Sequence, residues 1–199
     1  MQSGRGHMIR LSHYLVGLAA VSSLLATTAQ AGAGLGLLSS RREALAVAID
    51  GLCMPYLRHG GAIAPMAGLS GVPAALDGRP AVRLHGFGRV LVGTDTADNG
   101  CTIVAHDGDG RQARAEALKS LEGGYLLETL TGPNETVLHG VKWSGLNEAY
   151  CFRLDEKVVE ADIVTARDPS AEGSAHPDAL RLKLYWSDAE AIKKGVCKA

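Results

Sequence analysis

The chain has few aromatic residues, almost no net charge and no second long apolar segment. Its 199 residues include two tryptophans and two phenylalanines, so aliphatic side chains must fill most of the core. The 20 lysines and arginines nearly balance the 21 acidic residues. A chain without a basic excess is not typical of proteins that bind nucleic acids through their phosphates. After the N-terminal region no apolar run approaches about 18 residues, so we expect no transmembrane helix there.

Motifs that identify enzymes or phosphate-binding loops are also missing. Ser70 stands in a Gly-Leu-Ser-Gly sequence, but Val72 occupies the position where a nucleophile elbow needs its last glycine. The glycines at 32–36 lack the third glycine of a dinucleotide-binding loop, and no strand precedes them. The sequence therefore specifies no reaction, and we expect no cofactor.

The N-terminal residues have the pattern of an export signal. Arg10 precedes an apolar run at 15–26 that is too short to span a bilayer. Ala29-Gln30-Ala31 provides the small residues of a cleavage site, which predicts cleavage before Gly32. A start at Met8 would give a more compact signal, and an uncleaved N-terminal anchor is the competing interpretation. We expect a periplasmic or secreted protein.

The predicted mature chain, residues 32–199, has the size of one domain. Removal of the signal at 1–31 takes away Arg5 and Arg10 and no acidic residue, which leaves a net charge of about −3. Its histidines are far apart in sequence, so only the tertiary fold could bring them together at a metal. We expect no bound metal.

All four cysteines (Cys53, Cys101, Cys151 and Cys197) lie in the part predicted to be exported. In an oxidising compartment they are expected to form two disulfides. The pairs Cys53–Cys101 and Cys151–Cys197 are favoured, and each would close a loop of about fifty residues that stabilises the fold by roughly 4 kcal/mol. A Cys101–Cys151 bridge is the main alternative. The wide spacing, without a Cys-x-x-Cys motif, argues against a metal site.

Helical signals precede strand signals along the chain. Ser40 and Glu43 have the spacing of a capping box, and apolar residues follow at helical intervals until Gly60-Gly61, with Pro55 limiting or kinking the helix. Residues 62–80 are rich in proline and glycine and predict an irregular loop with a helical turn at 74–76.

From residue 81 the apolar period changes to two, which predicts strands. The first would span 81–92, with a bulge or bend at Gly86 and Gly88. Further strands are expected at 101–105, 125–130, 137–143, 150–154, 159–163 and 180–186, with a helix from about 110 to 121 and a final helical turn at 188–194. The predicted fold class is α+β, an antiparallel sheet with the N-terminal and middle helices packed on one face of a single domain.

The preferred binding patch consists of Arg83, His85, Phe87 and Arg89. These residues share the polar side of the predicted strand at 81–92. Two guanidinium groups and an imidazole could bind a carboxylate or phosphate, with the aromatic ring as an apolar floor. The alternative is a solvated strand face whose charges prevent edge-to-edge pairing.

Asp107, Asp109 and Glu116 partly match a calcium-binding loop, but Ala105 occupies the position where the first aspartate is needed. A tight turn followed by a helix cap explains the aspartates better.

Two other polar groups have plain structural explanations. His139 lies on an apolar strand face, where a histidine is more often a hydrogen-bonded core residue than a catalyst. Glu160 and Asp162 are two residues apart on one side of a predicted strand, a pattern more typical of a solvated face than of an acid–base pair.

We therefore expect an exported, disulfide-bonded binding protein whose partner is a protein, a glycan or a small anionic ligand. One alternative is a periplasmic hydrolase with an active site assembled from distant residues, His139 or His85 acting as the base. The other is a structural or envelope-assembly protein.

Overall fold

The computed structural model describes residues 38, 40–68, 71–86, 89–95, 98–106, 108–137, 144–166, 178–187 and 197. The chain divides into two units, Met1–Leu35 and Gly36–Ala199, and every described residue belongs to the second unit. The predicted signal peptide and the predicted turn at 188–194 lie outside the described residues.

The first helical region consists of α1 (Arg41–Ala46), the π-helical η1 (Val47–Cys53) and α2 (Met54–His59). The predicted capping box is confirmed, because the Glu43 amide donates to the Ser40 hydroxyl and the Ser40 amide donates to the Glu43 carboxylate, each at 3.2 Å. Pro55 is the second residue of α2, and the backbone stays helical on both sides of the boundary between η1 and α2, so the predicted helix passes Pro55 and continues to His59. The helix ends at Gly60, whose φ of 66° suits glycine.

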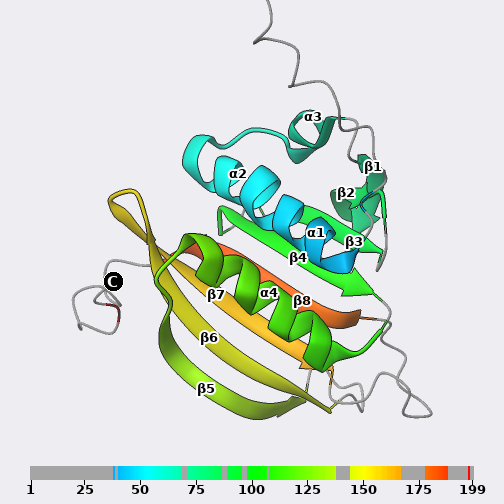
Figure 1. Ribbon diagram of the computed structural model, residues 1–199. Coiled ribbons are helices and arrows are strands. Elements are labelled where there is room, and N and C mark those ends of the chain that lie inside the picture. The colour runs from blue at the N-terminus through cyan, green and yellow to red at the C-terminus, as the bar shows by residue number, and fades with distance from the viewer. Residues whose placement is uncertain are drawn as a thin grey trace, which may run out of the picture. The chain divides into compact units, whose positions relative to one another are not determined.

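The described strands form an eight-stranded antiparallel sheet in the order β1-β2-β3-β4-β8-β7-β6-β5 (Figure 1). Because β8 pairs with β4, residues about eighty positions apart lie side by side at the centre of the sheet. The predicted antiparallel sheet is confirmed. The strands are β1 (Gly71–Leu76), β2 (Arg79–Leu84), β3 (Val90–Asp95), β4 (Gly100–His106), β5 (Glu128–Val137), β6 (Ser144–Leu154), β7 (Lys157–Ala166) and β8 (Asp178–Trp186).

The irregular loop predicted at 62–80 is wrong. This segment contains α3 (Ile63–Ala67) and the edge strand β1, which pairs with β2. Asp77 and Gly78 both have positive φ, 52° and 75°, as a two-residue hairpin turn requires. Pro73 is compatible with β1 because an edge strand needs hydrogen bonds on one side only.

The single strand predicted at 81–92 is also wrong, because the chain reverses within it. Strands β2 and β3 form a hairpin in which Arg83 lies opposite Leu91. Gly86 has a φ of 131°, and a β-carbon there would lie 2.3 Å from the Leu38 carbonyl oxygen. Gly86, where the sequence predicts a bulge or bend, therefore allows the chain to reverse and the backbone of Leu38 to approach closely.

Helix α4 (Gly110–Gly124) confirms the predicted middle helix and extends it by one turn. The Asp109 carboxylate accepts a hydrogen bond from the Arg111 amide and caps the helix. The strand expected at 125–130 begins instead at Glu128 and continues to Val137 as β5. The rest of the strand expected at 137–143 lies outside the described residues.

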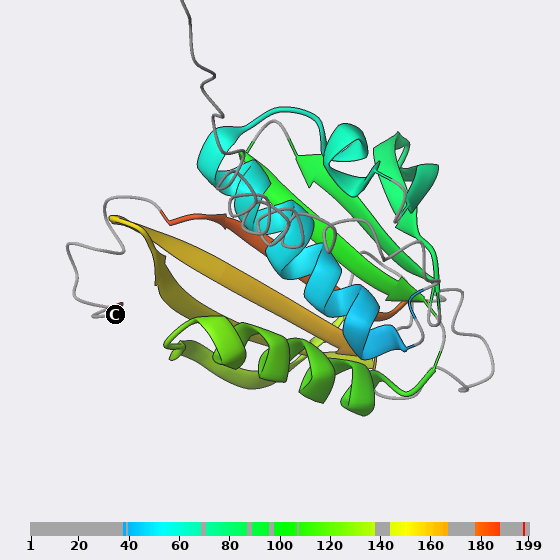
Figure 2. The same ribbon diagram turned by 45° about the horizontal axis from the view of Figure 1, so that its top comes forward.

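The main core joins the helices to alternate residues of the strands. Helices α1 and α4 lie side by side (Figure 2), and their buried residues belong to one cluster with residues of the other helices and of β2, β3, β4, β6, β7 and β8. The cluster is almost entirely aliphatic, as the composition predicts, and Tyr125 and Phe152 add one aromatic contact with ring centroids 4.6 Å apart. Its largest fully buried side chains include Leu45, Ile49, Leu52, Ile103, Leu121, Phe152, Ile163 and Leu182.

Two disulfides join distant parts of the fold, and they are the two pairs that the sequence favours. Cys53–Cys101 connects η1 to β4 inside the main core, with Cα atoms 5.5 Å apart. Cys151–Cys197 connects β6 to the C-terminal residues, with Cα atoms 6.2 Å apart. No helix within the described ranges has both the length and the apolar character needed to cross a membrane.

Candidate functional site

The residues of the predicted anion-binding patch lie around the β2–β3 turn. Arg83 is in β2 and Arg89 directly precedes β3, so the two arginines belong to opposite arms of a hairpin and not to one strand face. Both side chains are exposed, and His85 is half-buried. Phe87 lies outside the described residues. The patch stays a prediction, but the shared strand face from which it was inferred does not exist.

Other candidate residues have structural partners or lie outside the described part of the chain. Glu116, the last residue of the possible calcium loop, accepts a hydrogen bond from the Arg41 guanidinium at 2.7 Å and another from the Gln112 amide. Asp109 caps α4. Asp107 and His139 lie outside the described residues. Glu116 and Asp109 therefore stabilise the helices.

The structure instead brings polar residues together in a hollow beside β7 and β8. The hollow has a volume of about 550 Å³ and is lined by Asp98, Glu160, Asp162, Lys183, Tyr185 and Trp186. In the antiparallel register Glu160 lies opposite Tyr185, and Asp162 lies opposite Lys183. Because side chains alternate along a strand, these four residues share the side of β7 and β8 that Leu182, Leu184 and Ile163 do not use for the core. We call this surface the polar face.

Tyr185 connects two carboxylates within the hollow. Its hydroxyl oxygen lies 3.0 Å from an oxygen of Glu160 and 3.0 Å from an oxygen of Asp162. The other oxygen of Glu160 accepts a hydrogen bond from the Ser187 hydroxyl. A phenol carries one proton and can donate to only one carboxylate at a time. The second contact is favourable only if a carboxyl group is protonated or if a cation lies beside the pair.

Burial governs the ionisation of the hollow. It raises the pKa of Asp162 above its ordinary value, and the nearby Glu160 charge raises it further, while the Tyr185 hydrogen bond and the Lys183 charge offset part of the shift. Burial and both carboxylates also raise the pKa of the Tyr185 hydroxyl, so Tyr185 stays protonated. Each shift disfavours another negative charge at this place. A positively charged group in the hollow would reverse the shift of Asp162.

The nearest cations already have partners, and one of these pairs, Lys183 with Asp98, lies in the wall of the hollow. The Lys183 ammonium lies 2.5 Å from an Asp98 oxygen and 5.3 Å from the centre of the Tyr185 ring. The Lys157 ammonium lies 5.0 Å from the centre of a Trp186 ring. Within the described part of the chain, neither Glu160 nor Asp162 has a lysine or arginine at ion-pair distance. Among the described residues, Asp162 therefore feels the charge of Lys183 without an ion pair, and Glu160 has no ion pair with a lysine or arginine.

A second polar region, near β1 and β3, has a different charge balance. It includes a smaller hollow of about 220 Å³, and Arg79 and Asp95 on its wall form an ion pair. Arg181 binds Asp77 at 2.6 Å and Asp178 at 3.2 Å, and so connects β8 to the β1–β2 turn. Asp95, Asp77 and Asp178 each form an ion pair with an arginine of this chain. Their charges are therefore compensated without a cation from a partner.

Sequence reasoning assigned Glu160 and Asp162 to a solvated face and gave Tyr185 no role. The missing information was the pairing of β7 with β8, because residues 167–177 between them contain no turn signal that fixes a register. The alternation of Arg181, Lys183 and Tyr185 with the leucines of β8 does reveal a polar strand side. No family model, curated protein or solved structure matches this chain.

Proposed function

We propose that this chain is an exported, disulfide-bonded binding protein, and that the hollow on the polar face binds a positively charged group of its partner. The N-terminal pattern and the two disulfides support export to the periplasm or beyond, since structural disulfides persist in oxidising compartments. Among the partner classes considered, a protein with an exposed lysine or arginine suits the hollow better than a small anion.

The position of Tyr185 between Glu160 and Asp162 carries this proposal. An ammonium or guanidinium group would supply the hydrogen-bond donors that a single phenol cannot provide. It would also compensate two carboxylates that are half-buried. Charge complementarity of this kind favours the correct partner and speeds association.

Among the described residues, the helices share the core on the other side of the sheet from the polar face. We infer that the helices cover only the opposite face of the sheet, because α1, η1 and α4 share their core with Leu182, Leu184 and Ile163 and not with the residues of the polar face. A rigid sheet can hold the lining residues in fixed positions.

Calorimetric titration with a pentalysine peptide tests this proposal. We expect binding that weakens as salt is added, and at least about a tenfold loss of affinity in Glu160→Gln/Asp162→Asn. Glu122→Gln/Glu156→Gln is the matched control, since it removes the same charge from exposed positions outside the hollow. Equal affinities for the two double variants would contradict the proposal.

Export has a separate test. The protein recovered from the periplasm of an expressing bacterium should have lost residues 1–31 and should begin at Gly32. A chain that keeps its N-terminus and remains with the membrane fraction would instead support an uncleaved anchor.

A hydrolase is the second candidate, because His106 and Asp178 form a histidine–carboxylate pair. Their Nδ1 and Oδ1 atoms are 2.8 Å apart, although Nδ1 makes no hydrogen bond of good geometry. A carboxylate in this position can orient a histidine that acts as a base. Hydrolysis of generic ester or phosphate substrates that is lost in His106→Ala would support this candidate over a binding protein.

A further inference from the structure

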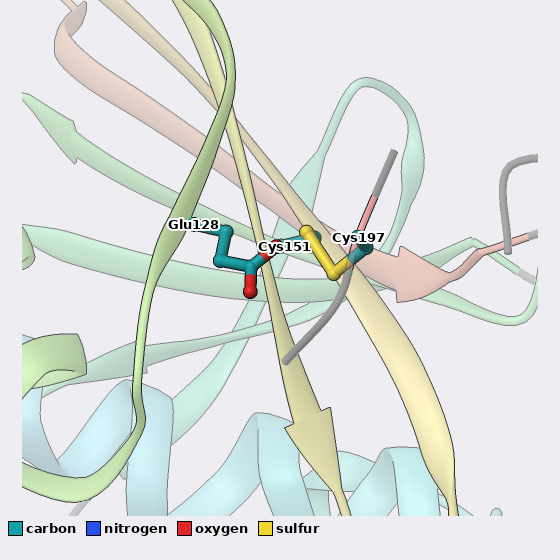
Figure 3. Close-up of side chains that lie close together, drawn as sticks. All are labelled: Glu128, Cys151 and Cys197. Carbon is teal, nitrogen blue, oxygen red and sulfur yellow. A yellow bond between two sulfur atoms is a disulfide. The ribbon is translucent and has the colours of Figure 1, made fainter. Parts of the chain in front are cut away.

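The Cys151–Cys197 disulfide has a carboxylate directly beside it. The two sulfur atoms and one oxygen of Glu128 all lie within 4.8 Å of one another (Figure 3). Glu128 of β5 is the register partner of Cys151 of β6, so the sheet holds the carboxylate on the same side as the sulfur. The sulfur atoms are buried beside Val158 and Leu130.

In the disulfide form these residues cannot bind a metal through thiolates, because the sulfurs are bonded to each other. A dithiol reductant would change this. It would transfer two electrons and two protons to the S–S bond and would itself become a disulfide, which leaves one thiol at Cys151 and one at Cys197. Three potential ligand groups would then surround one point: two thiols and the carboxylate of Glu128.

Two thiolates and one carboxylate are typical ligands of Zn²⁺. Zinc binds sulfur at about 2.3 Å and carboxylate oxygen at about 2.0–2.2 Å, in a tetrahedral arrangement. Such bond lengths place neighbouring ligand atoms roughly 3.5–3.8 Å apart. The ligand atoms of Glu128, Cys151 and Cys197 lie within 4.8 Å of one another. Small side-chain movements would therefore bring them to the distances that zinc requires.

We propose that reduction of Cys151–Cys197 produces a zinc site formed by Cys151, Cys197 and Glu128. The disulfide and the metal are alternative occupants of the same place, and zinc binding releases the two thiol protons. Cys151 is also the register partner of Glu160 in β7, so this place borders the hollow on the same side of the sheet. The zinc site uses other ligand atoms and does not depend on binding in the hollow. It departs from the sequence-based expectation of no metal site at the cysteines, which rested on their wide spacing in the sequence.

The other disulfide provides an internal control. Cys53 and Cys101 are fully buried in the apolar core. Among the described residues, the group at Glu128 is the one place where three or more potential metal-ligating side chains come together. Reduction at Cys53 and Cys101 would therefore give two thiols without a third ligand, and we expect no zinc site there.

The test uses the folded, oxidised full chain. The protein is treated with dithiothreitol, separated from it without oxygen, and titrated with Zn²⁺ in competition with a chromophoric chelator. We expect one tightly bound zinc per reduced chain and none per oxidised chain. Co²⁺ in place of zinc should give the absorption bands of thiolate coordination.

Three variants locate the site. Cys197→Ser should abolish tight binding, and Glu128→Gln should weaken it about tenfold or more. Glu122→Gln, which changes an exposed carboxylate of α4, should bind as the wild type does. Glu128→Gln keeps both disulfides, so it can be folded before reduction even if Cys197→Ser cannot.

The proposal is overturned if the reduced chain binds zinc no better than the oxidised chain, or if Glu128→Gln binds as tightly as the wild type. Loss of the folded circular dichroism spectrum on reduction would overturn it too. The site requires that the sheet keep Glu128 opposite Cys151.

Discussion

Arg114 of α4 binds both carboxylate oxygens of Glu148 in β6. Its Nη2 atom lies 2.7 Å from Oε2, and its Nε atom donates to Oε1. The Glu148 side chain is 1% exposed and also accepts a hydrogen bond from the Tyr150 hydroxyl at 2.8 Å. The pair connects a helix to the sheet and compensates a carboxylate that water cannot reach.

Removing Arg114 should therefore destabilise the fold. Arg114→Ala would leave the buried Glu148 charge unpaired, and we expect a loss of about 3 kcal/mol in the free energy of unfolding, measured with urea. Arg111→Ala, at an exposed position of the same helix, should change it by no more than about 0.5 kcal/mol. Replacing both partners in Arg114→Met/Glu148→Leu should recover most of the loss. Equal stability of the two alanine variants would contradict this role.

Two glycines of α4 should respond in opposite ways to alanine. A β-carbon at Gly110 would lie 2.5 Å from the Ala166 carbonyl oxygen and 2.9 Å from that of Ala179. Gly110→Ala should therefore force α4 away from β7 and β8 and destabilise the protein by about 2 kcal/mol. A β-carbon at Gly123 would meet nothing within 4 Å. Gly123→Ala should stabilise the protein by about 0.5 kcal/mol because alanine favours the helix, and thermal unfolding of both variants would check this.

The hairpin around Asp77 shows which parts of the fold can be predicted from sequence. Asp-Gly between two short runs is a local signal for a two-residue turn, but proline and glycine on either side hid the strands from a periodicity analysis. The capping box of Ser40 and the cap of Asp109 were predictable because both depend on neighbouring residues only. The pairing of β4 with β8 was not, because it depends on how the whole core packs.

The candidate site was less accessible to sequence analysis than the fold. Tyr185 meets Glu160 and Asp162 only through the register of two strands joined by a long segment, so no local pattern reports the contact. Conversely, the patch around Arg83 and Arg89 was inferred from a single strand that is a hairpin in the structure. The missed contact of Tyr185 and the misplaced patch have one cause. Side-chain alternation shows which residues share one face of a strand, but it does not show which strands lie beside it.

The two disulfides should differ in how easily they are reduced. Cys53 and Cys101 are 0% exposed in the main core, whereas Cys197 is 8% exposed and belongs to a small separate cluster. A local opening exposes Cys151–Cys197, but a larger unfolding event is needed to expose Cys53–Cys101. Mild dithiothreitol treatment followed by alkylation and peptide mass spectrometry should label Cys151 and Cys197 first. If Cys53 and Cys101 were labelled first, the main core would open more easily than the small cluster around Cys151 and Cys197, which would contradict this prediction.

The raised pKa of Asp162 predicts a defined pH dependence of stability. Because its folded-state pKa lies above the ordinary value of 3.8, the folded state binds this proton more tightly than the unfolded state does. The resulting stabilisation is present below about pH 3.8 and is lost as the pH rises through the raised pKa. Asp162→Asn should therefore be more stable than the wild type at neutral pH, and the difference should shrink in acid.

Urea unfolding at several pH values measures this effect. Asp50, whose pKa burial also raises, contributes a change in the same direction that Asp162→Asn should leave intact. If Asp162→Asn is less stable than the wild type at neutral pH, the carboxylate stabilises the fold and the account of the hollow is wrong.

On our proposal, the polar face of β7 and β8 binds a positively charged partner group. A titration of the ¹⁵N-labelled protein with pentalysine, followed by NMR, tests it most directly. We predict saturable shifts centred on the amides of Glu160, Asp162, Lys183, Tyr185 and Trp186, and their disappearance in Glu160→Gln/Asp162→Asn. Shifts that spread over all exposed acidic residues, or that centre elsewhere on the sheet, would contradict the claim.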